Sequence, residues 1–341
     1  MMLPKIDKHS IDGDLNYVAP KSFPIGPFKR YKKNPILKPN PDIEFESGYL
    51  YNATAIVIDD KVFLLYRAQN KKKTSSVGLA WSKDGFNFTK YHKPIIEPTE
   101  SWELIGGCED PRIVRDSVSK LFIVTYTAFD GKTARLCVAT SENLFDWTKY
   151  PTFVSPSWRD VAFNSNHEML IRKDWLKSGA IFTEKSKDGH YYMIWGDSHL
   201  YLASSKDLIH WKPLSNSFQH AQFTRPKLNH ESKLIEAGPA PFKLDNDKNQ
   251  WIFFYNACTN GGEKLSAETY SISEMLIDYD DIKSGPIARL DNPIMVPESK
   301  NEVDGQVNKV VFCEGIVQFH DKWLLYFGQG DSELGVAVAD V

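Results

Sequence analysis

Residues 52–82 read NATAIVIDDKVFLLYRAQNKKKTSSVGLAWS. The stretch contains three short apolar runs, and the first of them opens with the polar residue Asn52 and ends at a charged turn, residues 59–61. The second run, residues 62–67, ends in Tyr66-Arg67, and the third, residues 76–82, consists mostly of small residues. Short apolar runs separated by Asp, Asn and Lys turns are typical of β-strands joined as hairpins. The stretch therefore predicts a small antiparallel sheet.

The same pattern of a polar residue, apolar runs and a charged turn recurs four more times along the chain. The later copies begin at residues 110–114 (DPRIV), 179–182 (GAIF), 236–239 (EAGP) and 314–317 (EGIV). Five such units predict an all-β fold, a five-bladed β-propeller with a central active-site cavity. We expect one catalytic domain over residues 1–341, in which residues 1–45 form an N-terminal extension that packs on the propeller or closes it. A β-sandwich is the alternative, but it gives no reason for so long a repeat.

Composition and charge narrow the classes of function. The formal net charge is -3 and the densest basic run is only Lys71-Lys72-Lys73, so we expect no nucleic-acid partner. The four cysteines lie far apart without metal-ligand spacing and predict buried free thiols, and we expect neither a metal site nor a cofactor. The first thirty residues lack the apolar core of a signal peptide, and no apolar run is long enough to span a membrane. This favours a cytoplasmic location. A protein whose export signal had been trimmed would have the same sequence. The oligomeric state stays open.

The repeat also predicts where the chemistry lies. The first strand of a propeller blade lines the central channel, and the residues that open this strand in four of the copies are Asn52, Asp110, Glu236 and Glu314. Carboxylates that converge in a low-dielectric cleft push their pKa values apart, so that one serves as general acid and another as base. This is the arrangement of a glycosidase. Glu109, next to Asp110 on a strand, is expected to face the opposite way, toward an arginine.

Other polar side chains of the repeat are candidates for the same site. Glu268 is a further catalytic candidate, expected on the third strand of the fourth blade. The residues expected to hold the sugar, in addition to Asn52, are Arg67, Arg112, Asn166, His167, Lys185, Asp197 and Tyr255. The structural alternative is that the carboxylates cap turns or pair with the cations. A sugar-binding propeller without catalysis also remains open.

Residues 106–113 (GGCEDPRI) resemble glycoside hydrolase family 130, the β-mannoside phosphorylases and β-mannosidases. Further matches are residues 65–68 (LYRA), 78–85 (GLAWSKDG), 203–208 (ASSKDL), 236–241 (EAGPAP) and 310–315 (VVFCEG). The resemblance implies a five-bladed propeller, a β-linked mannoside as the oligosaccharide substrate, and an inverting mechanism in which Asp110 supplies the acid. In the phosphorylases of the family, the proton is thought to pass through a hydroxyl of the sugar.

Departures from the family's phosphorylase pattern favour its hydrolase branch. At the position of residues 234–238 the phosphorylases have a sequence similar to Lys-Ile-Gly-Ala-Gly, whereas this chain has LIEAG, which contains Glu236. At the position of residues 255–257 they have a sequence similar to Tyr-His-Gly, whereas this chain has YNA. They also carry an arginine near residues 195–197 (WGD). A carboxylate in place of a phosphate-binding cation can deprotonate water instead. We therefore predict an inverting exo-β-mannosidase that is β-1,2-specific, with Glu236 as base aided by Glu314. The alternatives are a β-mannoside phosphorylase and another five-bladed glycosidase.

Overall fold

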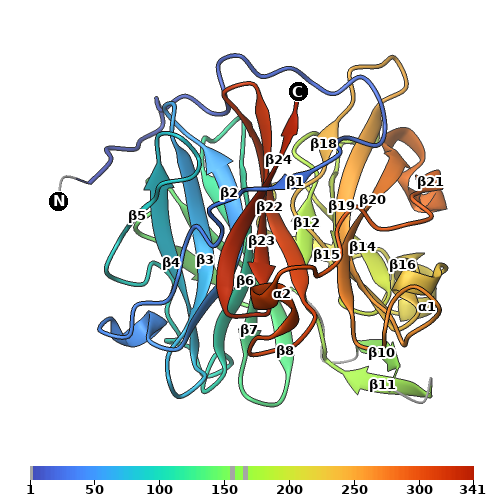
Figure 1. Cartoon of the computed structure of the whole chain (residues 1–341). Helices are drawn as coiled ribbons and strands as arrows, with labels where there is room; N and C mark the ends of the chain where they lie inside the picture. Colours follow the sequence, from blue (N-terminus) through green and yellow to red (C-terminus); the bar gives the residue numbers. More distant parts are fainter. Residues whose placement is uncertain (1–2, 154–157, 164–167) are drawn as a thin grey trace.

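The computed structural model describes residues 3–153, 158–163 and 168–341, and in this part of the chain the fold is all-β (Figure 1). The helical segments in the described residues are short, of three to six residues. They are η1 (Glu44–Glu46), α1 (Phe218–Ala221), η2 (Asn229–Glu231), η3 (Tyr279–Ser284) and α2 (Lys300–Val303). The all-β prediction is confirmed. No helix in the described residues is long and apolar enough to cross a membrane.

The first half of the chain forms an eight-stranded sheet that is almost divided in two. Its strands are β2 (Tyr49–Val57), β3 (Val62–Gln69), β4 (Ser75–Ser82), β5 (Thr89–Lys90), β6 (Gly107–Arg115), β7 (Phe122–Phe129), β8 (Ala134–Ser141) and β9 (Thr148–Tyr150). The strands within β2–β5 and within β6–β9 pair antiparallel, and the two groups are joined by one parallel pair, Ser75 with Gly107. Each group is one copy of the sequence repeat.

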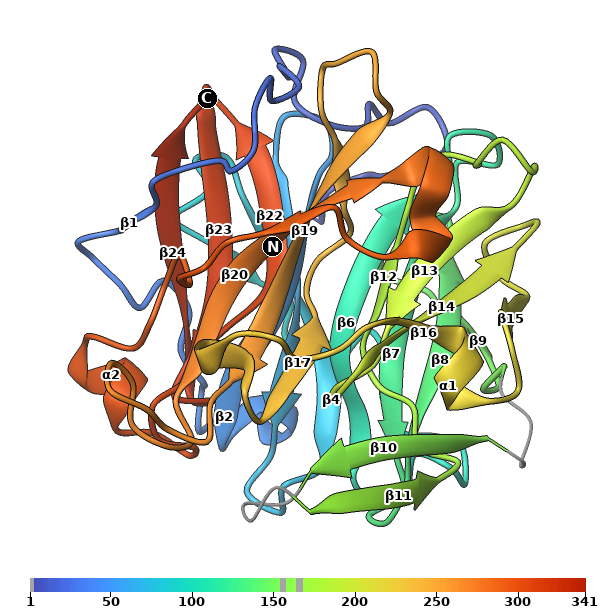
Figure 2. The ribbon, with the colours of Figure 1, turned by 90° about the vertical axis from the view of Figure 1, so that its right-hand side faces the viewer.

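The second half forms three further antiparallel sheets and a separate hairpin. One five-stranded sheet consists of β12 (Gly179–Ile181), β13 (Tyr191–Trp195), β14 (Leu200–Ser205), β15 (Trp211–Pro213) and β16 (Gln222–Thr224). A second five-stranded sheet consists of β17 (Leu234–Ala237), β18 (Phe242–Lys243), β19 (Gln250–Cys258), β20 (Tyr270–Asp278) and β21 (Ala288–Arg289). The last sheet is ordered β1 (Lys29–Arg30), β24 (Glu333–Asp340), β23 (Lys322–Gln329) and β22 (Val311–Phe319). The hairpin pairs β10 (Arg159–Phe163) with β11 (Met169–Lys173), and it lies across one end of the other sheets (Figure 2).

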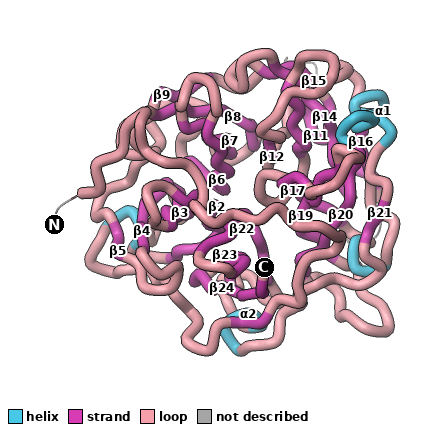
Figure 3. Tube along the Cα trace, turned by 90° about the horizontal axis from the view of Figure 1, so that it is seen from above, coloured by secondary structure: helices cyan, strands magenta, loops and turns pink. Residues whose placement is uncertain are grey.

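Seen from above, the sheets radiate from a common centre, and β2, β6, β12, β17 and β22 lie closest to it (Figure 3). The apolar core is divided into clusters that fill the spaces between neighbouring sheets. One cluster joins Phe63 of β3 to Val124 of β7, for example, and another joins Tyr66 of β3 to Tyr326 of β23. The first strands β2, β6 and β22 are thereby held side by side.

A buried glutamate recurs before the first strand of four of the repeat copies. Glu46, Glu103, Glu231 and Glu302 are each fully buried. The first three accept a hydrogen bond from a tyrosine on the second strand of the sheet: Tyr66, Tyr126 and Tyr255. Each of the four also pairs with a cation on the outer strand: Lys90, Lys149, Arg289 and Arg30. Because a buried carboxylate is stable only when it is paired and hydrogen-bonded, this cluster fastens the inner and outer strands of a sheet together.

The N-terminal segment is bound to the sheets at several points. Asp12 forms a β-bridge with Ile58, and the backbone of Val18 exchanges hydrogen bonds of 2.6 and 2.8 Å with the side chain of Gln318. β1 adds to the edge of β24, where Arg30 reaches Glu302 at 2.8 Å. Residues 29–30 thus form the outer strand of the sheet that contains residues 311–340. The four cysteines are buried and unpaired, as predicted.

Candidate active site

Irregular pairing occurs at the same place in three of the innermost strands. The register shifts between Tyr51 and Ala53 in β2, between Glu109 and Arg112 in β6, and between Cys313 and Gly315 in β22. The residues at the shifts are therefore Asn52, Asp110-Pro111 and Glu314. Asn52 and Asp110 have left-handed backbone conformations, with φ of 46° and 50°, which short polar side chains tolerate best. Because a bulge re-aims the side chain at its position, the alignment predicted from the repeat is built by these bulges.

Asp110 is the most densely contacted carboxylate of the site. It is 1% exposed, and Asn52 Nδ2 donates to its Oδ1 at 2.9 Å. Arg67 Nη1 donates to the same oxygen at 3.1 Å, and Lys177 Nζ lies 3.2 Å from Oδ2. Burial alone would raise the pKa of Asp110, but the charges of Arg67 and Lys177 outweigh burial and hold the pKa below its ordinary value. Asp110 is therefore ionised in the free site.

Glu109 forms the expected ion pair with an arginine, but the arginine is the one that also binds Asp110. Arg67 Nη2 donates to Glu109 Oε1 at 2.6 Å. The prediction that Glu109 faces away from Asp110 is wrong, because the bulge at Asp110-Pro111 breaks the regular alternation of side chains along β6. Burial raises the pKa of Glu109, and Arg67 offsets part of this shift.

Glu236 enters the site from β17, where it is only 5% exposed. Ser178 Oγ donates a hydrogen bond to its Oε1. Burial raises the pKa of Glu236 to about 7, and the charge of Lys177 opposes the shift while that of Asp197 adds to it. Asp110 and Glu236 thus have pKa values displaced in opposite directions, the condition that lets one carboxyl group give a proton and another take one.

Glu314 and Arg112 form a buried pair. Arg112 Nη2 lies 3.2 Å from Glu314 Oε1, yet neither oxygen of Glu314 accepts a hydrogen bond from any residue that the structure describes. Burial raises the pKa of Glu314 well above its ordinary value despite the charge of Arg112. Arg112 remains a predicted contact of the sugar, and its contacts in the structure are with the backbone. Its guanidinium is 2% exposed and donates to the backbone oxygens of Asp110, Ala237 and Gly238 at 2.6–3.0 Å, so it ties β6 to the end of β17.

Asp197 lies at the base of the β10–β11 hairpin. Arg172 of β11 donates to both of its carboxylate oxygens, at 2.6 and 3.1 Å, and Trp175 Nε1 donates to Oδ2 at 3.0 Å. Arg172 also pairs with Asp160 of β10, and its guanidinium lies 4.6 Å from the centre of the Trp175 ring. These contacts connect the hairpin to the loop that carries Lys177.

Three sequence-predicted residues lie outside this cluster. Glu268 precedes β20 instead of lying on it, and its carboxylate, 52% exposed, pairs with Lys233. Lys185 is exposed, with its ammonium 5.2 Å from the ring centre of Tyr191. Tyr255 is fully buried and donates to Glu231, the structural role that Tyr66 and Tyr126 have in their sheets. Asn166 and His167 fall outside the described residues.

Two charged residues of the site were missed in the sequence. Lys177 lies in the loop between β11 and β12, which is not part of the repeat, so no alignment of repeat copies could select it. Asp331 lies in the turn between β23 and β24, where burial raises its pKa to about 6 and Arg67 opposes the shift. Within residues 3–153, 158–163 and 168–341, no three His, Cys, Asp or Glu side chains are grouped so that they could hold a metal ion.

The site combines three buried carboxyl groups, Asp110, Glu236 and Glu314, and the half-buried Asp331 with the cations of Arg67 and Lys177. Carboxyl groups with separated pKa values can protonate a leaving oxygen and activate an attacking one, which is the chemistry of glycosidic bond cleavage.

Comparison with known proteins agrees with this chemistry. The model of glycoside hydrolase family 130, described as beta-1,4-mannooligosaccharide phosphorylase, matches residues 27–341. A 1,2-beta-oligomannan phosphorylase of Thermoanaerobacter sp. (strain X514) is 30% identical over 325 residues, which are 92% of this chain and 97% of the relative. A beta-1,2-mannobiose phosphorylase of the same organism is 29% identical over 331 residues, 91% of this chain and 96% of the relative.

A solved structure of the same family has a closely similar fold. It superposes with a TM-score of 0.80 at 31% identity, covering 94% of this chain and 95% of its own. Its description states that the GH130 family of mannoside phosphorylases contains glycoside hydrolases that target beta-1,2 mannosidic linkages in Candida mannan. The match over residues 27–341 and the likeness to these proteins show that the chain is an enzyme of glycoside hydrolase family 130, whose members act on mannosides.

Proposed function

We propose that this enzyme hydrolyses β-1,2-linked mannosides, releasing mannose from the non-reducing end with inversion at the anomeric carbon. The observation that carries the proposal is Glu236, a buried carboxyl group with a pKa of about 7, in the same charged cluster as Asp110. A general base works best when its pKa is close to the working pH. The β-1,2 linkage is supported by the descriptions of the two relatives and of the similar structure.

The proposed reaction assigns one proton transfer to each carboxyl group. Asp110 gives its proton to the leaving sugar oxygen while Glu236, aided by Glu314, takes a proton from the water that attacks the anomeric carbon. In the free site the proton resides on Glu236, because Asp110 is the more acidic of the two. Turnover thus requires the substrate to weaken the contact between Lys177 and Asp110, which raises the pKa of Asp110. Asn52, Arg67 and Asp197 would orient the sugar.

We further propose a single five-bladed propeller domain with its active site in the central cavity. Five clusters of buried apolar residues lie between successive sheets, and the series returns from the last sheet to the first. Residues 1–45 would close the ring, since β1 is the outer strand of the last sheet.

Phosphorolysis is the second candidate, and the named relatives support it more directly than they support hydrolysis. Both relatives are phosphorylases, and the description of the family model also names a phosphorylase. Phosphate would need free cations, whereas Lys177 and Arg67 are paired with Asp110. Asp197, whose pKa is lowered by Arg172, adds an ionised carboxylate to the same cluster, and such a group repels phosphate.

One assay separates the candidates. Purified enzyme is incubated with β-1,2-mannobiose, with and without inorganic phosphate, and mannose and mannose 1-phosphate are quantified. Mannose formation that is independent of phosphate supports hydrolysis, while strict phosphate dependence with mannose 1-phosphate as product overturns it in favour of phosphorolysis. Turnover of arabinosides or fructosides but not mannosides would identify another glycosidase activity. Binding without any turnover, unchanged in Asp110→Asn, would identify a sugar-binding protein.

A further inference from the structure

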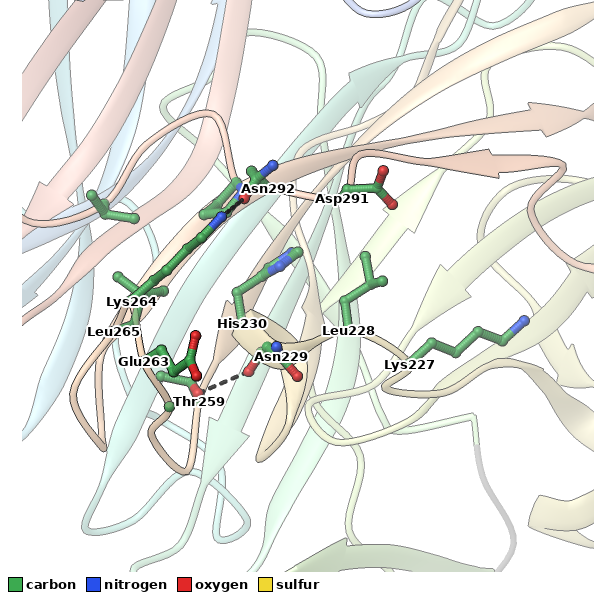
Figure 4. Close-up of a pocket in the computed structure, with 13 residues that line it drawn as sticks. Lys227, Leu228, Asn229, His230, Thr259, Glu263, Lys264, Leu265, Asp291 and Asn292 are labelled. Atoms are coloured by element: carbon green, nitrogen blue, oxygen red, sulfur yellow. Dashed lines mark hydrogen bonds between the residues drawn. The ribbon is translucent and has the colours of Figure 1, made fainter.

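A second cavity lies in the sheet of β17–β21, formed by three segments that the repeat brings together. It measures about 580 Å³, within the range of about 300–1,000 Å³ typical of small-molecule sites. The three segments are the η2 turn, the β19–β20 connection and the residues after β21. Their side chains His230, Lys264 and Asn292 face the same space (Figure 4). None of the residues proposed for catalysis lines this cavity.

The first sheet has a smaller counterpart in the equivalent position. That cavity, of about 440 Å³, is lined by residues of η1, of the β3–β4 connection and of residues 92–98 after β5. The main difference is the hairpin connection, which comprises residues 259–269 in the later sheet and residues 70–74 in the first. The longer connection supplies Glu263, Lys264 and Leu265 to the wall of the larger cavity. A common gap of the fold is thus enlarged in one sheet.

The lining of the larger cavity carries no net charge. Lys227 and Lys264 balance Glu263 and Asp291. At its floor His230 is 4% exposed, and burial lowers the pKa of this imidazole, so it is neutral and can donate or accept a hydrogen bond. A balanced lining gives no preference for an anion or a cation.

Several polar groups of the cavity remain available to a ligand. Asp291 and Asn229 line the cavity, and their side chains make no hydrogen bond to another residue that the structure describes. The backbone oxygen of Asn229 accepts a hydrogen bond from Thr259. Lys264 Nζ donates to Asn292 Oδ1 at 3.1 Å, which leaves the Asn292 amide hydrogens unpaired. Leu228, Leu265 and Pro293 add apolar surface. Donors, acceptors and apolar patches without net charge match the alternating hydroxyl groups and C–H faces of a neutral sugar.

We infer that this cavity is a secondary carbohydrate site that holds mannosyl units of a long substrate, outside the reacting site. The inference rests on the proposed function for the identity of the sugar. A second site on the same chain raises the effective concentration of a polymer near the catalytic site, and it has no effect on a substrate too short to reach both. The cavity should therefore change the preference for substrate length and leave the chemical step unchanged.

The test compares the double variant Asp291→Ala/Asn292→Ala with the wild type on β-1,2-mannobiose and on a long β-1,2-mannan. We expect unchanged kcat/KM on the disaccharide and a loss on the order of tenfold on the polymer, as expected when two hydrogen bonds are removed. The matched control is His92→Ala in the counterpart cavity of the first sheet, which should match the wild type on both substrates. Equal activity of the double variant and the wild type on the polymer overturns the inference.

A binding titration separates this inference from the proposed function. In the inactive variant Asp110→Asn, calorimetry with a β-1,2-mannooligosaccharide should detect two sites, and the addition of Asp291→Ala/Asn292→Ala should leave one. If the wild type cleaves no mannoside, the proposed function is wrong. The number of binding sites in the titration still shows whether the cavity binds the oligosaccharide. A single site in Asp110→Asn that the double substitution does not alter excludes a carbohydrate site there.

Discussion

Lys177 places its ammonium group 3.2 Å from Oδ2 of Asp110, so a loop residue outside the sequence repeat is the direct partner of the central carboxylate. The same charge acts on Glu236 and lowers its pKa against the effect of burial. Lys177 therefore sets the proton affinity of both groups that the proposed reaction requires.

Replacing Lys177 with alanine should move the pH profile of kcat/KM to higher pH. A nearby positive charge favours the ionised forms of Asp110 and Glu236, so its removal raises both pKa values, by about one unit or more. Lys185→Ala is the matched control, because Lys185 is exposed and its nearest described partner is the ring of Tyr191. A profile for Lys177→Ala that coincides with that of the control would contradict the assigned role.

The Glu236→Gln variant should lose most hydrolytic activity, by about 10²–10⁴-fold, because the amide cannot take a proton from water. In the wild type the descending limb of kcat/KM should lie near pH 7, because the reaction needs one proton on the pair of Asp110 and Glu236, and Glu236, which holds this proton in the free site, loses it there. Steady-state rates from pH 5 to 9 measure both effects. Glu268→Gln serves as control, because this half-exposed glutamate pairs with Lys233 away from the cluster, and it should change the rate less than twofold. Full activity of Glu236→Gln would exclude it as the base.

Tyr255→Phe should destabilise the protein and leave catalysis almost unchanged. The hydroxyl group of Tyr255 donates to the buried Glu231, and loss of such a bond to a charged acceptor costs about 1–3 kcal/mol of unfolding free energy. Thermal unfolding should show a Tm lower by a few degrees, and Tyr66→Phe in the first sheet should show a similar loss. A large fall in kcat/KM of the folded variant would instead support the sugar contact predicted from the sequence.

Glu274→Gln should stabilise the protein more at pH 8 than at pH 5. Glu274 is buried, its Oε2 accepts from the backbone of Ile25 at 3.1 Å, and burial raises its pKa from 4.5 to about 8. Between these values the folded state keeps a proton that the unfolded state has lost, so the wild type loses stability as pH rises. Glutamine keeps an acceptor for Ile25 without titrating. The free energy of unfolding of both proteins, measured by urea denaturation across this range, should diverge with increasing pH, and a constant difference would contradict the assignment.

The repeat was enough to predict the sheets and the convergence of four residues, Asn52, Asp110, Glu236 and Glu314. Asn52, Asp110 and Glu314 were expected to open their strands, but each is the fourth residue of a nine-residue strand, and the bulges at these positions preserve their alignment. Tyr255 was expected to contact the sugar, and in the structure it occupies the place that Tyr66 and Tyr126 have in other copies. A residue type that recurs in the repeat indicated a structural role, here the bond to a buried glutamate.

Residues whose position depends on loops could not be predicted. Lys177 reaches Asp110 because the β10–β11 hairpin, fixed through Arg172 and Asp197, determines the course of the following loop. Glu268 was expected on a strand, but the connection of residues 259–269 is long enough to carry it away from the centre. Local sequence patterns do not contain these tertiary constraints.

The pairing of β1 with β24 has a consequence for biosynthesis. Residues 29–30 are synthesised well before their partners at residues 337–338. Until β24 has been made, β1 has no edge on which to pair, and the ion pair between Arg30 and Glu302 forms without the support of that strand pairing. The two ends of the described chain must therefore meet before the last sheet is complete, which makes this sheet a late step of folding.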